Sequence, residues 1–173
     1  MADSDAWLQA LPSFHCFACD PDHDRGLRLA FDVAGPERLR CEFTVTGEYV
    51  GPGRFVHGGI IATVFDDLMV WCLLRFRRRF HVTVQMEQRF RRPVFTDIPL
   101  VAEALIVEDL PGGRVRMATT LVAAADPGTV LVEGSAVFTA TPPALVELIP
   151  EEQRTEMYAL LGTFGTPPAA GSR

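Results

Sequence analysis

The sequence of 173 residues contains no lysine and no asparagine. All 16 basic residues are therefore arginine, which excludes a phosphate-binding loop that depends on lysine and a lysine Schiff base. None of the four serines lies in a Gly-x-Ser-x-Gly motif, which argues against an α/β-hydrolase. The 22 acidic residues outnumber the basic ones and give a net charge of −6, so binding to nucleic acid is not expected.

Cysteine is scarce as well, and no long apolar run is present. The four cysteines are too few for a disulfide scaffold and are expected to be reduced thiols of a cytoplasmic protein. The most apolar stretch, residues 60–74, is short and contains Asp66 and Asp67, so no membrane span is expected. Residues 1–10 carry two aspartates and no basic run, unlike a secretory signal.

The spacing of apolar residues predicts a single α+β domain. Two strand patterns, at residues 27–33 and 38–45, precede one long helix at residues 60–75. Four more strand patterns follow the helix, at residues 81–90, 100–109, 114–125 and 129–140. The run Asp126-Pro127-Gly128 predicts a hairpin turn. We expect one long helix on a curled antiparallel sheet within residues 27–141, after an irregular segment (1–26) and before a short helix and loose tail (142–173).

The predicted helix is apolar almost all the way round, which indicates that it is buried. Asp66 and Asp67 lie in its middle, where an ionised carboxylate without a partner is costly. One interpretation is that both aspartates reach solvent at a helix edge or form an ion pair with an arginine. The other is that one of them has a chemical role. Gly58 and Gly59 in front of the helix favour a role, because a first turn without side chains can hold a developing oxyanion on its free N–H groups.

The segment from Gly51 to Asp66 resembles the motif of hot-dog-fold acyl-CoA thioesterases, in particular the phenylacetate-degradation (PaaI-like) branch. The pattern is His-Gly-Gly, here residues 57–59, with six residues between the second glycine and the acidic Asp66. Two more segments resemble the family: Cys16 to Cys19 with Gly26-Leu27, and Thr83 to Val94 with its Arg-Pro ending. The chain departs from many relatives in lacking an asparagine upstream of the histidine and in having Asp20 after the second cysteine.

The resemblance implies a single hot-dog domain, in which the sheet wraps the central helix, that hydrolyses an acyl-CoA-type thioester. It implies that Gly58 donates its N–H to the thioester oxygen and that Gly59 shapes the turn. His57 then orients the substrate or supports the loop. Asp66 attacks the thioester or activates a water, and Thr83 holds that water or polarises the site.

Helix geometry adds a condition on how these parts assemble. Gly58 and Asp66 are eight residues apart, which is about 12 Å along a helix. One carbonyl group cannot touch both within a subunit, so the site is expected to combine two protomers, as in the family's paired hot dogs. A homodimer is therefore expected to be required, and a homotetramer stays open.

Arginines concentrate in residues 75–92, where seven of them accompany one acidic residue. Those at positions 75 and 77–79 are expected to complement the carboxyl end of the helix and to reach solvent. Arg91 and Arg92 are the better candidates for substrate binding, because guanidinium groups bind phosphates, here those of coenzyme A, through two parallel hydrogen bonds. Coenzyme A is then part of the substrate, and no other cofactor is expected.

Cys16 and Cys19, near His15 and His23, have the spacing of zinc ligands, but a second pair is absent. No metal site is therefore expected, although the sequence leaves open whether these two cysteines bind a metal. Two alternatives to hydrolysis remain: a non-catalytic acyl-thioester binding protein, and a hot-dog hydratase or dehydratase. The latter needs a differently placed Asp/His pair. The sequence does not identify the acyl group, and it does not say whether coenzyme A or a carrier protein bears that group. It also leaves open whether Asp66 acts as a nucleophile or as a general base.

Overall fold

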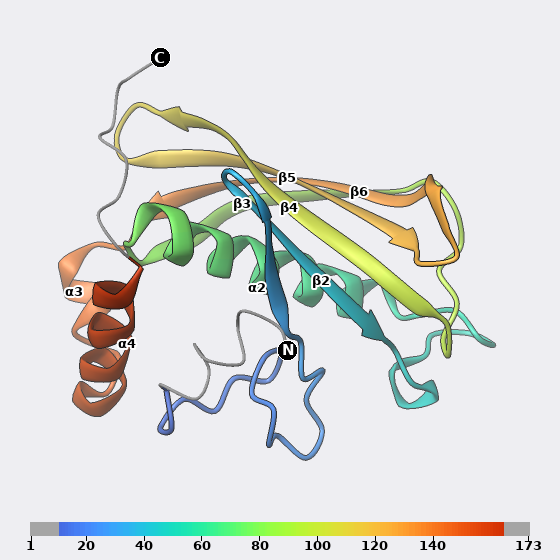
Figure 1. Ribbon diagram of the computed structural model, residues 1–173, viewed down its shortest axis with the longest axis horizontal. Coiled ribbons are helices and arrows are strands. Elements are labelled where there is room, and N and C mark those ends of the chain that lie inside the picture. Colours follow the sequence, from blue (N-terminus) through green and yellow to red (C-terminus); the bar gives the residue numbers. More distant parts are fainter. Residues whose placement is uncertain (1–10, 165–173) are drawn as a thin grey trace.

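In the computed structural model, which describes residues 11–164, a six-stranded antiparallel sheet curves over one long helix (Figure 1). The strands in spatial order are β1 (Phe31–Gly35), β2 (Arg38–Thr44), β4 (Pro99–Leu110), β5 (Arg114–Ala123), β6 (Asp126–Ala140) and β3 (His81–Phe90). The helices are η1 (Gly47–Tyr49), α2 (Gly58–Arg77), α3 (Pro143–Val146) and α4 (Glu151–Thr163). The expected long helix on a curled antiparallel sheet is confirmed.

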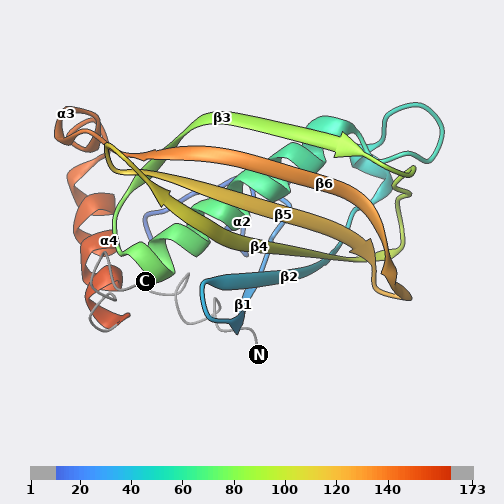
Figure 2. The ribbon, with the colours of Figure 1, turned by 90° about the horizontal axis from the view of Figure 1, so that it is seen from above.

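Strand β3 forms one edge of the sheet and β1 the other, as the view from above shows (Figure 2). Hydrogen bonds join β3 to β6 only, so its outer edge has no partner within residues 11–164. Apolar side chains are exposed along this strand, with exposed fractions of 37% for Val82, 58% for Val84 and 50% for Phe90. A ten-residue edge strand with exposed apolar side chains is a ready surface for pairing with another chain.

Helix α2 lies at the centre of the core, because apolar side chains project from it on nearly all sides. Nine of its side chains are buried: Ile61, Val64, Phe65, Leu68, Met69, Trp71, Cys72, Leu73 and Leu74. The helix is longer than predicted at both ends. His57 caps it and brings Gly58 and Gly59 into the first turn, and Arg78 ends it in a left-handed conformation with φ of 51°.

Gly134 of β6 lets the sheet approach α2 closely. A Cβ atom at this position would lie 2.7 Å from Cδ2 of Phe65 and would also overlap Oγ1 of Thr119. Real Cβ atoms do not approach other heavy atoms so closely, so any larger residue forces the helix and sheet apart. Glycine is therefore the residue that fits here.

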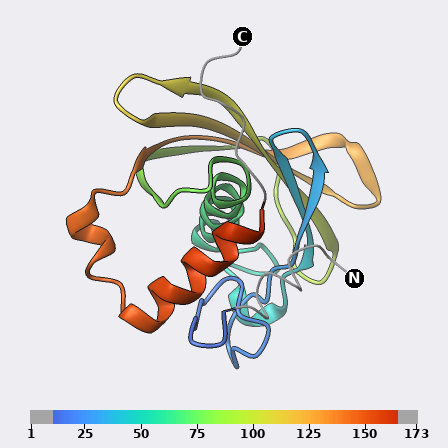
Figure 3. The same cartoon turned by 60° about the vertical axis from the view of Figure 1, so that its left-hand side comes forward.

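Residues 11–26 of the amino-terminal segment and α4 cover the side of α2 that faces away from the sheet (Figure 3). Leu11, Ala18 and Cys19 of the amino-terminal segment are buried in the common core. The segment also binds α4, because Ser13 donates its backbone N–H and its hydroxyl to the carboxylate of Glu156, at 3.1 and 2.7 Å. The irregular segment thus completes the core of the domain.

Two local predictions are wrong. The first strand begins at Phe31 and not at Leu27, because Leu27 and Leu29 donate their N–H groups to the carbonyls of Phe17 and Ala18. The last hairpin turns at residues 124–125, since Ala123 pairs with Asp126 while Val122 pairs with Val130. Residues 127–129 therefore form a bulge at the start of β6, and the Pro-Gly pair does not make the turn.

The helix after the sheet is present as α3 and α4, although the expected loose tail falls largely on residues 165–173, outside the described residues. The division of the chain after residues 26 and 141 stays a prediction. No helix within residues 11–164 is long and apolar enough to span a membrane.

Candidate functional site

The first turn of α2 leaves one backbone donor free. His57 accepts the N–H of Gly59 on its Nδ1 atom at 3.0 Å, and its carbonyl accepts the N–H of Ile60 at 2.9 Å. Among the described residues, the N–H of Gly58 has no acceptor. The histidine therefore serves as the helix cap, and Gly58 keeps a donor at the positive end of the helix dipole.

In this turn a Cβ atom would be crowded at Gly59 but would make only an ordinary contact at Gly58. A Cβ atom on Gly59 would lie 3.1 Å from Nδ1 of His57, which is tighter than most real contacts. A Cβ atom on Gly58 would lie 3.4 Å from Cζ of Phe90, at the end of β3. Because Nδ1 accepts a hydrogen bond, neutral His57 carries its proton on Nε2.

Asp66 and Thr83 are in direct contact half-way along α2. The hydroxyl of Thr83 donates to Oδ1 of Asp66 at 2.6 Å, and Oδ2 has no recorded partner among the described residues. Both side chains reach solvent. The sequence predicted both residues for the site, and the structure brings them together.

A β-bulge beside this pair was not predicted. Thr83 pairs with Phe138 and Gln85 with Val137, so Val84 is an extra residue in β3. Bulges turn neighbouring side chains and are common next to active sites. This one directly follows Thr83, and no turn residue or proline marks it in the sequence.

Asp67 faces a different environment from Asp66. The Cys16 thiol donates to its Oδ1 atom at 3.7 Å, whereas Oδ2 is buried and has no hydrogen-bond partner in the part of the chain that the structure describes. Burial raises the pKa of Asp67 well above its usual value. A side-chain hydrogen bond with Cys19 lowers the pKa of Cys16 to about 6. No local pattern in the sequence connects Asp67 to the cysteines, because Cys16 lies 51 positions before it.

Arg91 and Arg92 lie at the end of β3, near the start of α2. The Arg91 guanidinium binds Glu133, with its Nη2 atom 2.9 Å from the carboxylate, whereas the exposed Arg92 side chain has no recorded partner among the described residues. Both residues and Phe90 line a cavity of about 310 Å³. Phe90 also lies beside Gly58, since its Cζ atom is 3.4 Å from the position that a Cβ atom on Gly58 would take.

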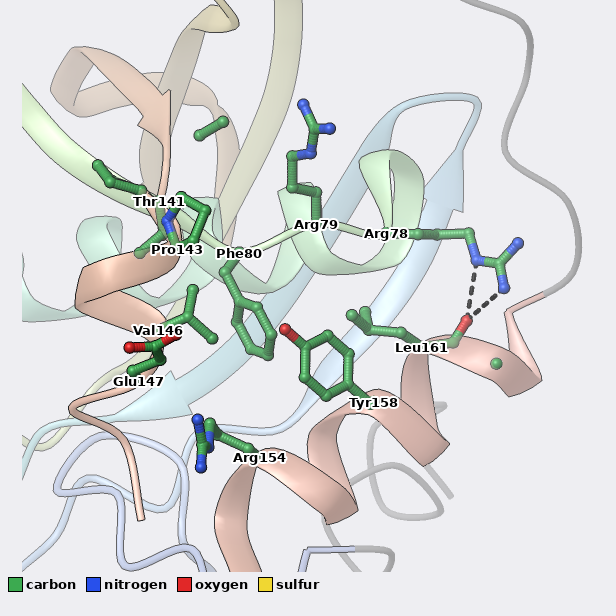
Figure 4. Close-up of a pocket in the computed structure, with 13 residues that line it drawn as sticks. Arg78, Arg79, Phe80, Thr141, Pro143, Val146, Glu147, Arg154, Tyr158 and Leu161 are labelled. Atoms are coloured by element: carbon green, nitrogen blue, oxygen red, sulfur yellow. Dashed lines mark hydrogen bonds between the residues drawn. The ribbon is translucent and has the colours of Figure 1, made fainter. Parts of the chain in front are cut away.

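A larger cavity of about 990 Å³ lies at the other end of α2, between the strands and α3 and α4 (Figure 4). Arg78 lines it and donates from Nε and Nη2 to the carbonyl of Leu161 at 2.8 and 2.6 Å, which ties α4 to α2. Arg77 binds Glu37 and Asp109. Arg77 and Arg78 were expected to reach solvent, but both bind other groups of the protein. No predicted site residue lines this cavity.

The predicted site residues thus form two groups on one chain. One group, at the start of α2, contains His57, Gly58, Gly59, Arg91 and Arg92. The other, half-way along the helix, contains Asp66 and Thr83. An eight-residue helical separation of about 12 Å keeps Gly58 and Asp66 from acting on one carbonyl within the same chain.

Comparisons with known proteins give the family context. A sequence model of the thioesterase superfamily matches residues 53–108. The structure is similar to thioesterase superfamily member 2 from Mus musculus, at 20% identity and a TM-score of 0.62, over 79% of this chain and 96% of that one. It is also similar to the E. coli PaaI protein from the phenylacetic acid degradation operon, at 15% identity and a TM-score of 0.58, over 67% of this chain and 81% of that one.

Another solved structure, described as a thioesterase superfamily protein, is 22% identical with a TM-score of 0.64 over 72% of this chain, which spans 60% of that protein's length. No curated protein matches the sequence. The resemblance drawn from the His-Gly-Gly motif is thereby confirmed: the chain is a hot-dog-fold protein whose residues 53–108 carry the sequence pattern of the thioesterase superfamily.

Proposed function

We propose that this protein hydrolyses an acyl-CoA-type thioester to a free acid and a thiol. The superfamily match supports hydrolysis of a thioester in general. The observation that carries the finer proposal is the first turn of α2, where His57 occupies the N–H of Gly59 and leaves that of Gly58 free. A donor of this kind, at a helix start, stabilises the oxygen of a tetrahedral intermediate.

In the proposed mechanism, the thioester oxygen accepts the N–H of Gly58 while Asp66 acts on the carbonyl carbon. Thr83 holds Oδ1 of Asp66, so Oδ2 is the reacting atom. It either attacks the carbon or takes a proton from a water that attacks. Attack moves the carbonyl electron pair onto the thioester oxygen, which carries the negative charge in the tetrahedral intermediate. When the carbonyl bond forms again, the C–S bond breaks and the thiolate leaves and takes up a proton. If Asp66 attacks, water hydrolyses the resulting anhydride, and both routes consume one water.

The two groups of site residues meet in this proposal through a second copy of the chain. Gly58 of one protomer and Asp66 of its partner would face the same thioester, since about 12 Å separates them within one helix. The unpaired outer edge of β3, with exposed Val84 and Phe90, supports a homodimer through this strand. A tetramer of two such dimers is compatible with the same contact.

Arg92 is the proposed phosphate ligand for coenzyme A. Its guanidinium is exposed and lacks a recorded ion pair, whereas Arg91 is neutralised in part by Glu133. Both arginines line a cavity with Phe90, which lies beside Gly58, and this arrangement supports binding of the pantetheine arm between the arginines and the first turn of α2. The reaction itself requires no metal or redox cofactor, because Asp66 and the Gly58 donor supply the chemistry.

The test is release of free thiol from a panel of acyl-CoA thioesters of different chain length, including aromatic acyl groups and an acyl carrier protein thioester. We expect thiol release to depend on Asp66 with at least one coenzyme A substrate. Saturable binding without thiol release would instead identify a thioester-binding protein. Hydration of an enoyl-CoA without thiol release would identify a hydratase.

A further inference from the structure

A second cluster of reactive side chains lies outside the proposed thioesterase site. The Sγ atoms of Cys16 and Cys19 and a carboxylate oxygen of Asp67 lie within 4.8 Å of one another. The cysteines come from a turn of the amino-terminal segment, and Asp67 from the middle of α2. Asp67 projects about 100° around the helix from Asp66, so the two carboxylates lie in different surroundings.

We propose that Cys16, Cys19 and Asp67 form a zinc site that fastens the amino-terminal segment to α2. In tetrahedral zinc sites, Zn–S bonds of about 2.3 Å and Zn–O bonds of about 2.0–2.2 Å put neighbouring ligand atoms roughly 3.6–3.8 Å apart. The distance between Sγ of Cys16 and Oδ1 of Asp67 is 3.7 Å. The third donor lies within reach of small side-chain rotations.

The backbone around the cysteines suits two thiolate ligands. The N–H of Cys19 donates to Sγ of Cys16 at 3.1 Å, and the N–H of Asp20 donates to the carbonyl of Cys16 at 3.1 Å. This turn holds both thiols on the side that faces α2. A backbone N–H that donates to sulfur stabilises negative charge on it, which is what metal binding requires.

Asp67 supplies the second, independent observation. Its Oδ2 atom is buried and has no hydrogen-bond partner within residues 11–164, although an unpaired buried carboxylate oxygen is costly. A cation bound between this carboxylate and the thiolates removes the cost. Within residues 11–164, no arginine forms an ion pair with Asp67 that could remove the cost instead.

The ligand set favours zinc over harder cations. Calcium and magnesium prefer oxygen ligands, whereas thiolates bind zinc and related soft metals. Neither nearby histidine belongs to the cluster, since His15 binds Asp20 and His23 accepts the N–H of Arg25. The site therefore has three protein ligands, and a water completes the tetrahedron.

The test uses the full chain, freed of metal by a chelator and kept reduced by a phosphine. Titration with Co²⁺ should produce a thiolate-to-cobalt charge-transfer band that saturates near one ion per chain and disappears when Zn²⁺ is added. Cys16→Ser and Cys19→Ser should abolish the band. Asp67→Asn, which keeps the shape of the side chain, should weaken binding by at least about tenfold.

Two control variants change residues of α2 that lie outside the site. Cys72→Ala removes a buried cysteine of α2, and Asp66→Asn removes the carboxylate next to Asp67, so both variants should bind Co²⁺ as the wild type does. Zn²⁺ should raise the Tm of the wild type and of these controls but not that of Cys16→Ser. Circular dichroism of each reduced variant shows whether it is folded.

The absence of a saturable band in the folded wild type would overturn the proposal, as would an equal affinity of Asp67→Asn. A Cys16–Cys19 disulfide in the isolated protein, with no Co²⁺ uptake after reduction, would also overturn it. No readout is an enzyme activity, so the outcome is independent of whether thioester hydrolysis is found.

Discussion

Asp66 and Asp67 are adjacent in sequence, but their side chains have opposite surroundings. Asp66 reaches solvent beside Thr83, whose hydroxyl binds one carboxylate oxygen. Asp67 turns toward the amino-terminal segment, where Cys16 and Cys19 lie. A rotation of about 100° per residue along the helix separates these environments. The two carboxylates are therefore expected to affect different properties of the protein.

We expect Asp66→Asn to lower kcat by roughly 10²–10⁴-fold, because the amide can neither attack the thioester nor accept a proton. KM should change little, since other residues hold the acyl chain and coenzyme A. Steady-state assays of thiol release measure both constants. Asp67→Asn is the matched comparison, and it should act on stability instead. An inactive Asp67→Asn beside a nearly normal Asp66→Asn would reverse the assignment.

Arg92→Ala should raise KM for acyl-CoA by up to about tenfold, which corresponds to loss of one charge-assisted contact with a phosphate. KM for a short pantetheine thioester should stay the same, because that substrate lacks the nucleotide phosphates. Arg116→Ala, which removes an exposed ion-paired arginine from β5, is the control. Equal effects of Arg92→Ala on both substrates would contradict phosphate binding.

At the scale of elements, Gly134 sets the distance between β6 and α2. Gly134→Ala should lower the free energy of unfolding by about 1–3 kcal/mol, because its methyl group would overlap Phe65 and Thr119. Urea denaturation measures this change. Gly47→Ala is the control, since a Cβ atom there meets no atom within 4 Å. A Gly134→Ala protein as stable as the control would show that helix and sheet separate easily.

At the scale of the whole molecule, a site shared between subunits should allow two inactive variants to restore activity when they are mixed. Asp66→Asn and Gly58→Leu should each be inactive alone. In a mixed dimer, one of the two sites has both intact groups, so an equimolar mixture should regain about a quarter of wild-type activity if subunits exchange at random. Thiol release after mixing measures the recovery.

Exchange of subunits must be shown separately, for example by mass spectrometry of the mixed dimers. Exchange without recovery of activity would rule out the shared site. A protein that sediments as a monomer at assay concentrations and is still active would rule it out too.

The sequence by itself determined the fold class, and it predicted the candidate residues that form the two groups on the structure. Apolar residues all round one helix, and alternating ones in the strands, have few ways to be buried other than a sheet curled over that helix. The spacing of His57, Gly58 and Asp66 along one helix also follows from local geometry, so the separation of about 12 Å needed no structure.

Only the tertiary structure decided which distant residues meet. Thr83 reaches Asp66 because β3 pairs with β6 with a bulge at Val84, and Cys16 reaches Asp67 because the amino-terminal segment folds back across α2. The hairpin before β6 also turns at residues 124–125, since pairing along β5 outweighs the local turn preference of Pro127-Gly128. Such contacts depend on the packing of the whole chain, because residues far apart in sequence have no local pattern that relates them.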